Sequence, residues 1–207
     1  MSPRRVPDGD TGRAAAIEAL RGGGIVALPT DTVYGIAVAL DARDGIPRLF
    51  AAKSRPPDRS IALLVADRVQ AEALGELDTT ARALADAFWP GGLTLVVPRR
   101  EGLALPPELT SDARTVGLRV PDHAAPRALA AAVGPLPTTS ANRSGEPEAR
   151  DADAIEAVLG DAIELILDGG PAPGGPASTV VDCTGPRPRV LRVGAVALEA
   201  IEAVVGR

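Results

Sequence analysis

The chain has 207 residues and a net charge of −5, and 45% of its residues are hydrophobic while only 2% are aromatic. A chain of this length buries roughly 70% of its unfolded surface, so a packed interior of Ala, Val, Leu and Ile is expected. The acidic balance argues against a protein that wraps nucleic acid, because such binding draws on clustered cations.

Strands and helices alternate along the chain, with turn signals between them. In chain order we expect helices over residues 11–21, 44–53, 67–75, 79–88, 125–133, 151–159 and 197–205. Strands are expected over residues 25–28, 35–40, 60–66, 93–97, 115–120, 136–140, 162–167, 178–183 and 189–193. Asp10 or Thr11, Asp44, Asp78 and Asp151 stand where helix N-caps would lie.

Several expected strands follow one another without an intervening helix, which favours a mixed sheet over a wholly parallel one. We therefore expect a single α/β domain with a twisted, mixed parallel and antiparallel sheet over residues 10–207. Residues 1–9 are expected to be a flexible N-terminus. No linker, internal repeat or low-complexity tract divides the chain.

The apolar segments are too short to cross a membrane, since runs such as IALLVA at residues 61–66 fall far below the ~20 residues required. Residues 1–13 contain no apolar signal core, so a cytoplasmic location is expected. The single cysteine, Cys183, excludes an intramolecular disulfide and a cysteine metal cluster. Its strand-like neighbours predict a buried side chain.

Lys53 is the only lysine among the 22 lysines and arginines. A chain that has drifted to arginine elsewhere would keep a lysine where a compact, strongly hydrated ammonium is needed. Lys53 is therefore a candidate functional residue. Tyr34, Trp89 and Asn142 also occur once each, in polar or Gly/Pro-rich junctions.

Four polar junctions adjoin the expected strands and helices: PTDT at 29–32, KSRPPDR at 53–59, SANRSG at 140–145 and GGPAPGGPAST at 169–179. Ligands of α/β sheets gather where strands end and loops begin. Many hydroxyls and fixed cations with few carboxylates suit an anion with several phosphates. The chain has neither G-x-x-x-x-G-K-[ST] nor G-x-G-x-x-G, so a nucleotide would not be held by a P-loop or a Rossmann turn.

Each junction also has a structural explanation. Thr30 and Thr32 are equally well explained as turn residues, and Ser140 with Asn142 as an Asx or Ser/Thr turn. Asp31 is interpreted as structural rather than as a general base or a magnesium ligand.

Taken together and in order, these pieces resemble the YrdC-type threonylcarbamoyl-adenylate synthases from about residue 10 to the C-terminus. The resemblance rests on PTDTVYG, KSRPPD, WPGGLT, GLRVP, TSANRSG and STVVD. It implies a YrdC-like sheet with helices on both faces and a deep, positively charged central cavity. It also implies an ATP-dependent nucleotidyltransferase that joins L-threonine, bicarbonate and ATP into threonylcarbamoyl-AMP and pyrophosphate. The chain resembles the short form, which lacks an extra C-terminal domain.

The resemblance further implies residue roles, position by position. Threonine would be bound by Thr30, Arg119 and Ser178. Lys53 and Arg55 would act catalytically on the phosphates, and ATP would be bound by Lys53, Arg59, Thr115, Ser140, Asn142 and Arg192. Mg²⁺ would arrive with ATP and be carried mainly by its phosphates, with no protein metal site. Ser60 and Gly92 stand where the family usually has proline.

The implied product serves threonylcarbamoylation of the adenosine beside the tRNA anticodon, which a separate transferase completes. tRNA would be reached through that transferase complex, with weak direct RNA contact at most, and no membrane is involved. Two alternatives stay open: a carbamoyl-transfer relative of the hydrogenase-maturation type, and an RNA-binding module that uses the positive cavity. The scarcity of aromatics argues against the second, because single-strand binders stack bases on aromatic rings.

Overall fold

The computed structural model describes residues 2–54, 61–109 and 112–206. Its strands are β1 (Arg4–Pro7), β2 (Val26–Leu28), β3 (Gly35–Ala37), β4 (Ala62–Leu64), β5 (Leu93–Pro98), β6 (Thr115–Arg119), β7 (Leu136–Ser140), β8 (Leu165–Asp168), β9 (Thr179–Asp182) and β10 (Arg189–Arg192). Its α-helices are α1 (Asp10–Arg21), α2 (Gly45–Ala52), α3 (Arg68–Leu74), α4 (Thr79–Phe88), α5 (Ala124–Val133), α6 (Ala152–Leu159) and α7 (Leu198–Val205), and short 3₁₀ turns cover Pro107–Leu109 and Gly160–Ala162. Within these described ranges, no helix combines the length and the apolar character that a membrane span requires.

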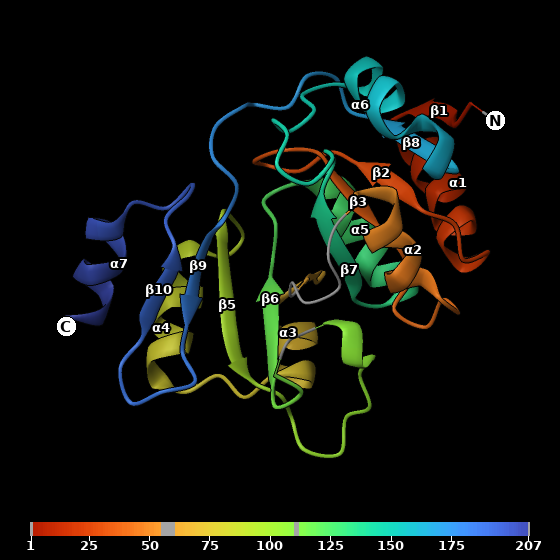
Figure 1. The fold of residues 1–207 in the computed structure, drawn as a ribbon. Coiled ribbons are helices and arrows are strands. Elements are labelled where there is room, and N and C mark those ends of the chain that lie inside the picture. The colour runs from red at the N-terminus through yellow and green to blue at the C-terminus, as the bar shows by residue number, and fades with distance from the viewer. Residues whose placement is uncertain (1, 55–60, 110–111, 207) are drawn as a thin grey trace.

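The strands of the described residues form one mixed sheet in the order β1-β8-β2-β3-β7-β4-β6-β5-β9-β10. β8 runs parallel to β1 and β2, β4 to β6 and β5 to β9, and the other neighbours are antiparallel. The predicted α/β domain with a mixed sheet is confirmed. Because β8 and β9 lie near opposite edges of the sheet, the connection over residues 169–178 crosses almost all of it, and Figure 1 shows this segment arching from one side of the molecule to the other.

Helices cover both faces of the sheet, because successive strand residues point to opposite sides. In β2, Val26 and Leu28 belong to one apolar cluster and Ala27 to the other. Helices α1 and α5 pack on the first cluster with side chains such as Leu20 and Leu129. Helices α2, α3, α4, α6 and α7 supply the second. The expected arrangement of helices on both faces is therefore confirmed.

Side-chain caps form at two of the four helix starts where we expect them. Asp78 and Asp151 cap α4 and α6, and each carboxylate accepts a first-turn backbone N–H, at 2.7 and 2.8 Å. The expectation for α1 is wrong, because neither Asp10 nor Thr11 caps this helix, which starts after a glycine without a side-chain bond. Asp44 does occupy the N-cap position of α2, but it has a left-handed φ of 53° and makes no side-chain capping bond.

The N-terminal segment is a strand at the sheet edge, which corrects the expectation of a flexible terminus over residues 1–9. Arg4–Pro7 pair in parallel with Leu165–Asp168 of β8, and the Arg5 guanidinium lies 2.9 Å from the Asp168 carboxylate. The sequence RRVP has only one clearly strand-forming residue, so its strand conformation depends on a partner from the other end of the chain. The domain therefore begins no later than Arg4.

Candidate functional site

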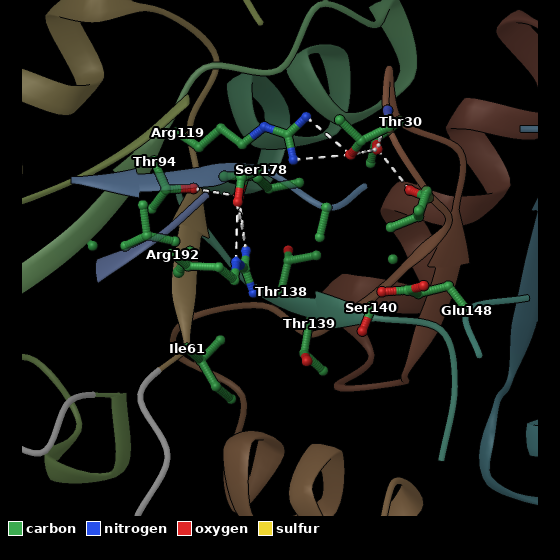
Figure 2. Close-up of a pocket in the computed structure, with 18 of the residues that line it drawn as sticks. Thr30, Ile61, Thr94, Arg119, Thr138, Thr139, Ser140, Glu148, Ser178 and Arg192 are labelled. Atoms are coloured by element: carbon green, nitrogen blue, oxygen red, sulfur yellow. Dashed lines mark hydrogen bonds between the residues drawn. The ribbon is translucent and has the colours of Figure 1, made fainter. Parts of the chain in front are cut away.

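A cavity of about 360 Å³ opens over the middle strands of the sheet. Alternate residues of neighbouring strands line it, because they project to the same face. Thr94 and Val96 of β5 lie beside Thr115, Gly117 and Arg119 of β6, with Val96 paired to Gly117. The rest of the described wall comes from residues 30 and 32–35, from β4, β7, β9 and β10, and from Ile61, Glu148, Ala177 and Ser178. Segments from most of the chain thus meet at one hollow, shown in Figure 2.

One corner of this cavity is an arginine held by the PTDT loop. Arg119 is only 6% exposed. Its Nη2 donates to Asp31 Oδ1 at 2.7 Å, both Nη atoms donate to Thr32 Oγ1 at 3.2 Å, and Nε donates to Gly91 O at 3.0 Å. Burial lowers the pKa of Arg119, and the neighbouring Asp31 carboxylate opposes that shift. The break in the apolar segment after Pro29 therefore places a carboxylate and a hydroxyl against a buried cation.

The hydroxyls of Thr30 and Thr32 are engaged within the same loop. Thr30 Oγ1 donates to Val33 O at 2.6 Å and accepts from Thr32 N at 3.1 Å. A threonine hydroxyl has one hydrogen, so the 3.1 Å contact between the two hydroxyls must be donated by Thr32. Thr30 lines the cavity as expected, yet it can bind a substrate through its side chain only by exchanging one of these partners. Figure 2 shows Thr30 at the same end of the cavity as the Arg119 guanidinium.

A second polar corner joins Ser178, Arg192 and Thr94. Thr94 Oγ1 lies 2.8 Å from Ser178 Oγ. The Arg192 guanidinium donates to Ser178 O at 2.8 and 3.1 Å and to Ser178 Oγ at 3.2 Å. Burial is the largest cause of the lowered pKa of Arg192, Arg119 adds to it by repulsion, and Glu148 opposes it. The structure therefore brings Ser178 and Arg192 to the same cavity as Thr115 and Arg119.

Lys53 lies behind the cavity wall and contacts a residue that forms it. Its ammonium donates to Ser140 O at 2.5 Å, to Ser140 Oγ at 3.2 Å and to Asn142 Oδ1 at 2.7 Å. Ser140 lines the cavity, whereas Lys53 and Asn142 are 3% and 8% exposed and stand outside its described wall. These three expected residues are thus brought together, with Ser140 in front. Arg55, Arg59 and Ser60 lie outside the described residues.

Tyr34 links the cavity to the connection over residues 169–178. It is fully buried and lines the cavity. Its hydroxyl donates to Gly170 O at 2.6 Å and accepts from Gly169 N at 3.0 Å, and burial raises its pKa. Since the same connection ends at Ser178, the tyrosine fixes the start of a segment whose end forms part of the wall.

Sequence reasoning missed several wall residues. Thr94 and Thr138 lie on strands, and the alternation of LTLVV places Thr94 on the face of Val96, so a signal for it was present. Thr139 adjoins Thr138 in β7 and lines the same cavity. Glu148 comes from a loop after SANRSG, and no sequence pattern points to it.

The charge of the described wall is close to balanced. Arg119 and Arg192 face one glutamate, Glu148, and Arg119 is already paired with Asp31. The positive cavity thus stays a prediction. In the parts of the chain that the structure describes, no group of three or more His, Cys, Asp or Glu side chains is arranged to hold a metal ion.

Comparisons with known proteins agree with this fold. The family model Sua5_yciO_yrdC, described as "Telomere recombination", matches residues 18–194. The chain is 39% identical over 201 residues to the threonylcarbamoyl-AMP synthase of Bacillus subtilis, which covers 96% of this chain and 57% of that protein. It is 40% identical over 158 residues to the threonylcarbamoyl-AMP synthase of Chromohalobacter salexigens, which covers 75% of this chain and 84% of that protein.

A crystal structure of Pyrococcus abyssi Sua5 complexed with L-threonine superposes on the chain with a TM-score of 0.90 at 36% identity. It covers 100% of this chain and 61% of that one, so the chain spans less than two thirds of that relative. The family model covers most of the chain, including every described strand except β1 and all the described residues that line the cavity. The chain belongs to the Sua5/YciO/YrdC family.

Proposed function

We propose that the protein is an L-threonylcarbamoyladenylate synthase, which joins L-threonine, bicarbonate and ATP and releases pyrophosphate. The observation that carries this proposal is the shared cavity of about 360 Å³, to which Arg119, Ser140, Ser178 and Arg192 contribute from distant parts of the chain. Relatives at about 40% identity carry the synthase name, and the P. abyssi relative is described with L-threonine bound. The chain spans 57% of the B. subtilis protein. That this chain carries the activity of the whole B. subtilis protein is therefore part of what we propose.

The Arg119 corner is the proposed threonine end of the cavity. A guanidinium is suited to carboxylates because its N–H groups match carboxylate oxygens in geometry and charge. Ser178, from the second corner, adds a hydroxyl to the same cavity, and Thr30 lines it beside the loop that holds Arg119. Threonine would therefore be held by Arg119, Thr30 and Ser178.

The other polar corner is the proposed ATP end. Arg192 and Thr115 line the cavity together with Ser140, which Lys53 and Asn142 hold from behind. The resemblance adds Arg59 to the ATP-binding residues and Arg55, with Lys53, as catalytic residues. A direct contact between Lys53 and phosphate would require its ammonium to exchange one of its present acceptors.

The reaction needs little covalent help from the protein. Threonine's amine combines with bicarbonate to give a carbamate and water, and a carbamate oxygen then attacks the α-phosphorus while pyrophosphate leaves. Positioning the two substrates and stabilising phosphate charge account for such catalysis. ATP brings Mg²⁺ with its own phosphates, since this ion keeps waters and takes few protein ligands.

The proposed partners follow from this chemistry. Bicarbonate is the third substrate, and the adenylate passes to a separate transferase that modifies tRNA. The proposal places the protein in the cytoplasm, where ATP and tRNA are available.

The test is pyrophosphate release from ATP that depends on both threonine and bicarbonate. We expect release only when both are present. Arg192→Ala should lower the rate by roughly 10²-fold, comparable to the loss of one strong donor to developing charge. Arg187→Ala is the matched control, because Arg187 is exposed in the turn before β10, and it should leave the rate unchanged.

Two results would contradict the proposal. ATP turnover driven by carbamoyl phosphate, without threonine, would favour the carbamoyl-transfer alternative. Tight tRNA binding without ATP, weakening steeply with salt, would favour the RNA-binding module.

A further inference from the structure

Arg119 donates four hydrogen bonds to the residues around it, and the shortest goes to a carboxylate that has no role in the proposed function. This carboxylate is that of Asp31, and it lies 2.7 Å from Nη2. Asp31 stands outside the described wall of the cavity, and its side chain is 15% exposed. Asp31 thus contacts Arg119 without being one of the residues that line the cavity.

We propose that Asp31 is a positioning residue, which fixes the Arg119 guanidinium so that its remaining N–H group meets the carboxylate of the amino-acid substrate. The inference rests on the proposed function, because the substrate is the threonine assigned to this corner. It concerns a residue that makes no direct contact with substrate.

The donor count of Arg119 supports this role. A guanidinium side chain has five N–H groups. Nε–H is used by Gly91 O, the two N–H groups of Nη2 by Asp31 and Thr32, and one N–H of Nη1 by Thr32. One N–H of Nη1 is left without a partner among the described residues. Because Arg119 is 6% exposed and lines the cavity, a ligand can reach this donor only from the cavity.

Removing Asp31 would have two opposite effects on a substrate carboxylate. The buried cation would lose its counter-charge, so it would attract a second carboxylate more strongly. It would also lose its shortest hydrogen bond, so the guanidinium could rotate away from the substrate. If Asp31 only neutralised charge, threonine binding would tighten. If Asp31 positions Arg119, binding and reaction weaken, since a misplacement of about 1 Å can cost about 10²-fold.

The experiment measures pyrophosphate release with threonine and ATP varied separately. For Asp31→Ala we expect the threonine KM to rise by roughly 10- to 10²-fold, while the ATP KM changes by less than about threefold. For Asp31→Asn we expect a smaller rise, because the amide oxygen can still accept from Nη2, though in a weaker, uncharged-acceptor bond. Calorimetric titration with threonine alone should rank the threonine affinities in the same order, with the wild type tightest, Asp31→Asn weaker and Asp31→Ala weakest.

Asp8→Ala is the matched control. Asp8 pairs with Arg13 at 2.6 and 3.2 Å, and its side chain is 10% exposed, close to the value for Asp31. This variant should lower the melting temperature without changing the threonine KM. If Asp31→Ala does not fold, Asp31→Asn carries the test alone, because it removes the charge at Asp31 and keeps an oxygen that can accept from Nη2.

The outcomes separate the inference from the function. Wild-type protein without threonine-dependent turnover would overturn both. Wild-type turnover combined with an unchanged or lowered threonine KM in Asp31→Ala or Asp31→Asn would overturn the positioning role alone. A threonine KM that rises in these variants and not in Asp8→Ala supports it.

Discussion

The single lysine offers the sharpest test of how the wall behind Ser140 works. Lys53→Met removes the ammonium while keeping a long apolar side chain, and Lys53→Arg keeps the charge but changes its shape. Lys53 is 3% exposed and donates to three acceptors on Ser140 and Asn142 at 2.5 to 3.2 Å. The two variants therefore separate the need for charge from the need for a compact donor.

The expected loss follows from those contacts. Each charge-assisted hydrogen bond contributes about 1.5–3 kcal/mol, but several kcal/mol of desolvation offsets the sum. A net loss of about 2–3 kcal/mol remains for Lys53→Met. At about 2–4 °C per kcal/mol for a domain of this size, the melting temperature should fall by about 4–12 °C. Pyrophosphate release should fall by roughly 10²-fold, because Ser140 loses its support.

Lys53→Arg should lower the melting temperature and the rate of pyrophosphate release at least as much as Lys53→Met. A planar guanidinium cannot direct three donors to acceptors grouped around one point, and its extra volume overpacks a buried position. The assays are thermal unfolding and pyrophosphate release at saturating substrates. Arg43→Lys is the control for the exchange itself, since the Arg43 side chain is 97% exposed. A Lys53→Arg protein with wild-type melting temperature and rate would refute the reasoning from the lone lysine.

Three further predictions concern single contacts. Tyr34→Phe removes the hydroxyl that bonds Gly169 and Gly170, so amide exchange over residues 169–177 should quicken, as mass-resolved hydrogen exchange would report. Thr94→Val keeps the shape but removes the 2.8 Å contact with Ser178 Oγ, and the threonine KM should rise several-fold, by about 1 kcal/mol, with an unchanged ATP KM. Burial raises the pKa of Cys183 to about 12, so the native thiol should react with a thiol reagent at mildly alkaline pH far more slowly than the urea-unfolded one. The unfolded thiol has a pKa of about 8.5. The free energy of unfolding should therefore also decrease as the pH rises above this value towards 12.

Most of the fold follows from local patterns. The strand expected over 115–120 is Thr115–Arg119 and the helix expected over 79–88 is Thr79–Phe88, because apolar alternation and an aspartate cap mark them in the sequence. β1 could not be predicted in this way, since RRVP becomes a strand only when β8 supplies its hydrogen-bond partners. The buried position of Cys183, at 6% exposure, followed from its strand-like neighbours.

The same difference between local patterns and long-range contacts applies to the site. Motif order was enough to predict that Arg119, Ser140, Ser178 and Arg192 belong together, and they line one cavity. Their partners were not predictable, because Asp31 and Arg119 are 88 residues apart and β7 and β4 lie between β3 and β6 in the sheet, so no local pattern relates the two. That each wall residue binds its assigned substrate stays a prediction, which the assays described above test.

The late position of β8 and β9 in the chain affects how the protein can be synthesised. β8 inserts between β1 and β2, and β9 pairs with β5, so each half of the sheet needs a strand made near the end of translation. Until residues 165–182 have left the ribosome, β2 and β5 each keep an unpaired edge, and pairing across such sequence separations is slow. A nascent chain should therefore depend on chaperone protection of these edges and complete its sheet only when synthesis is nearly finished.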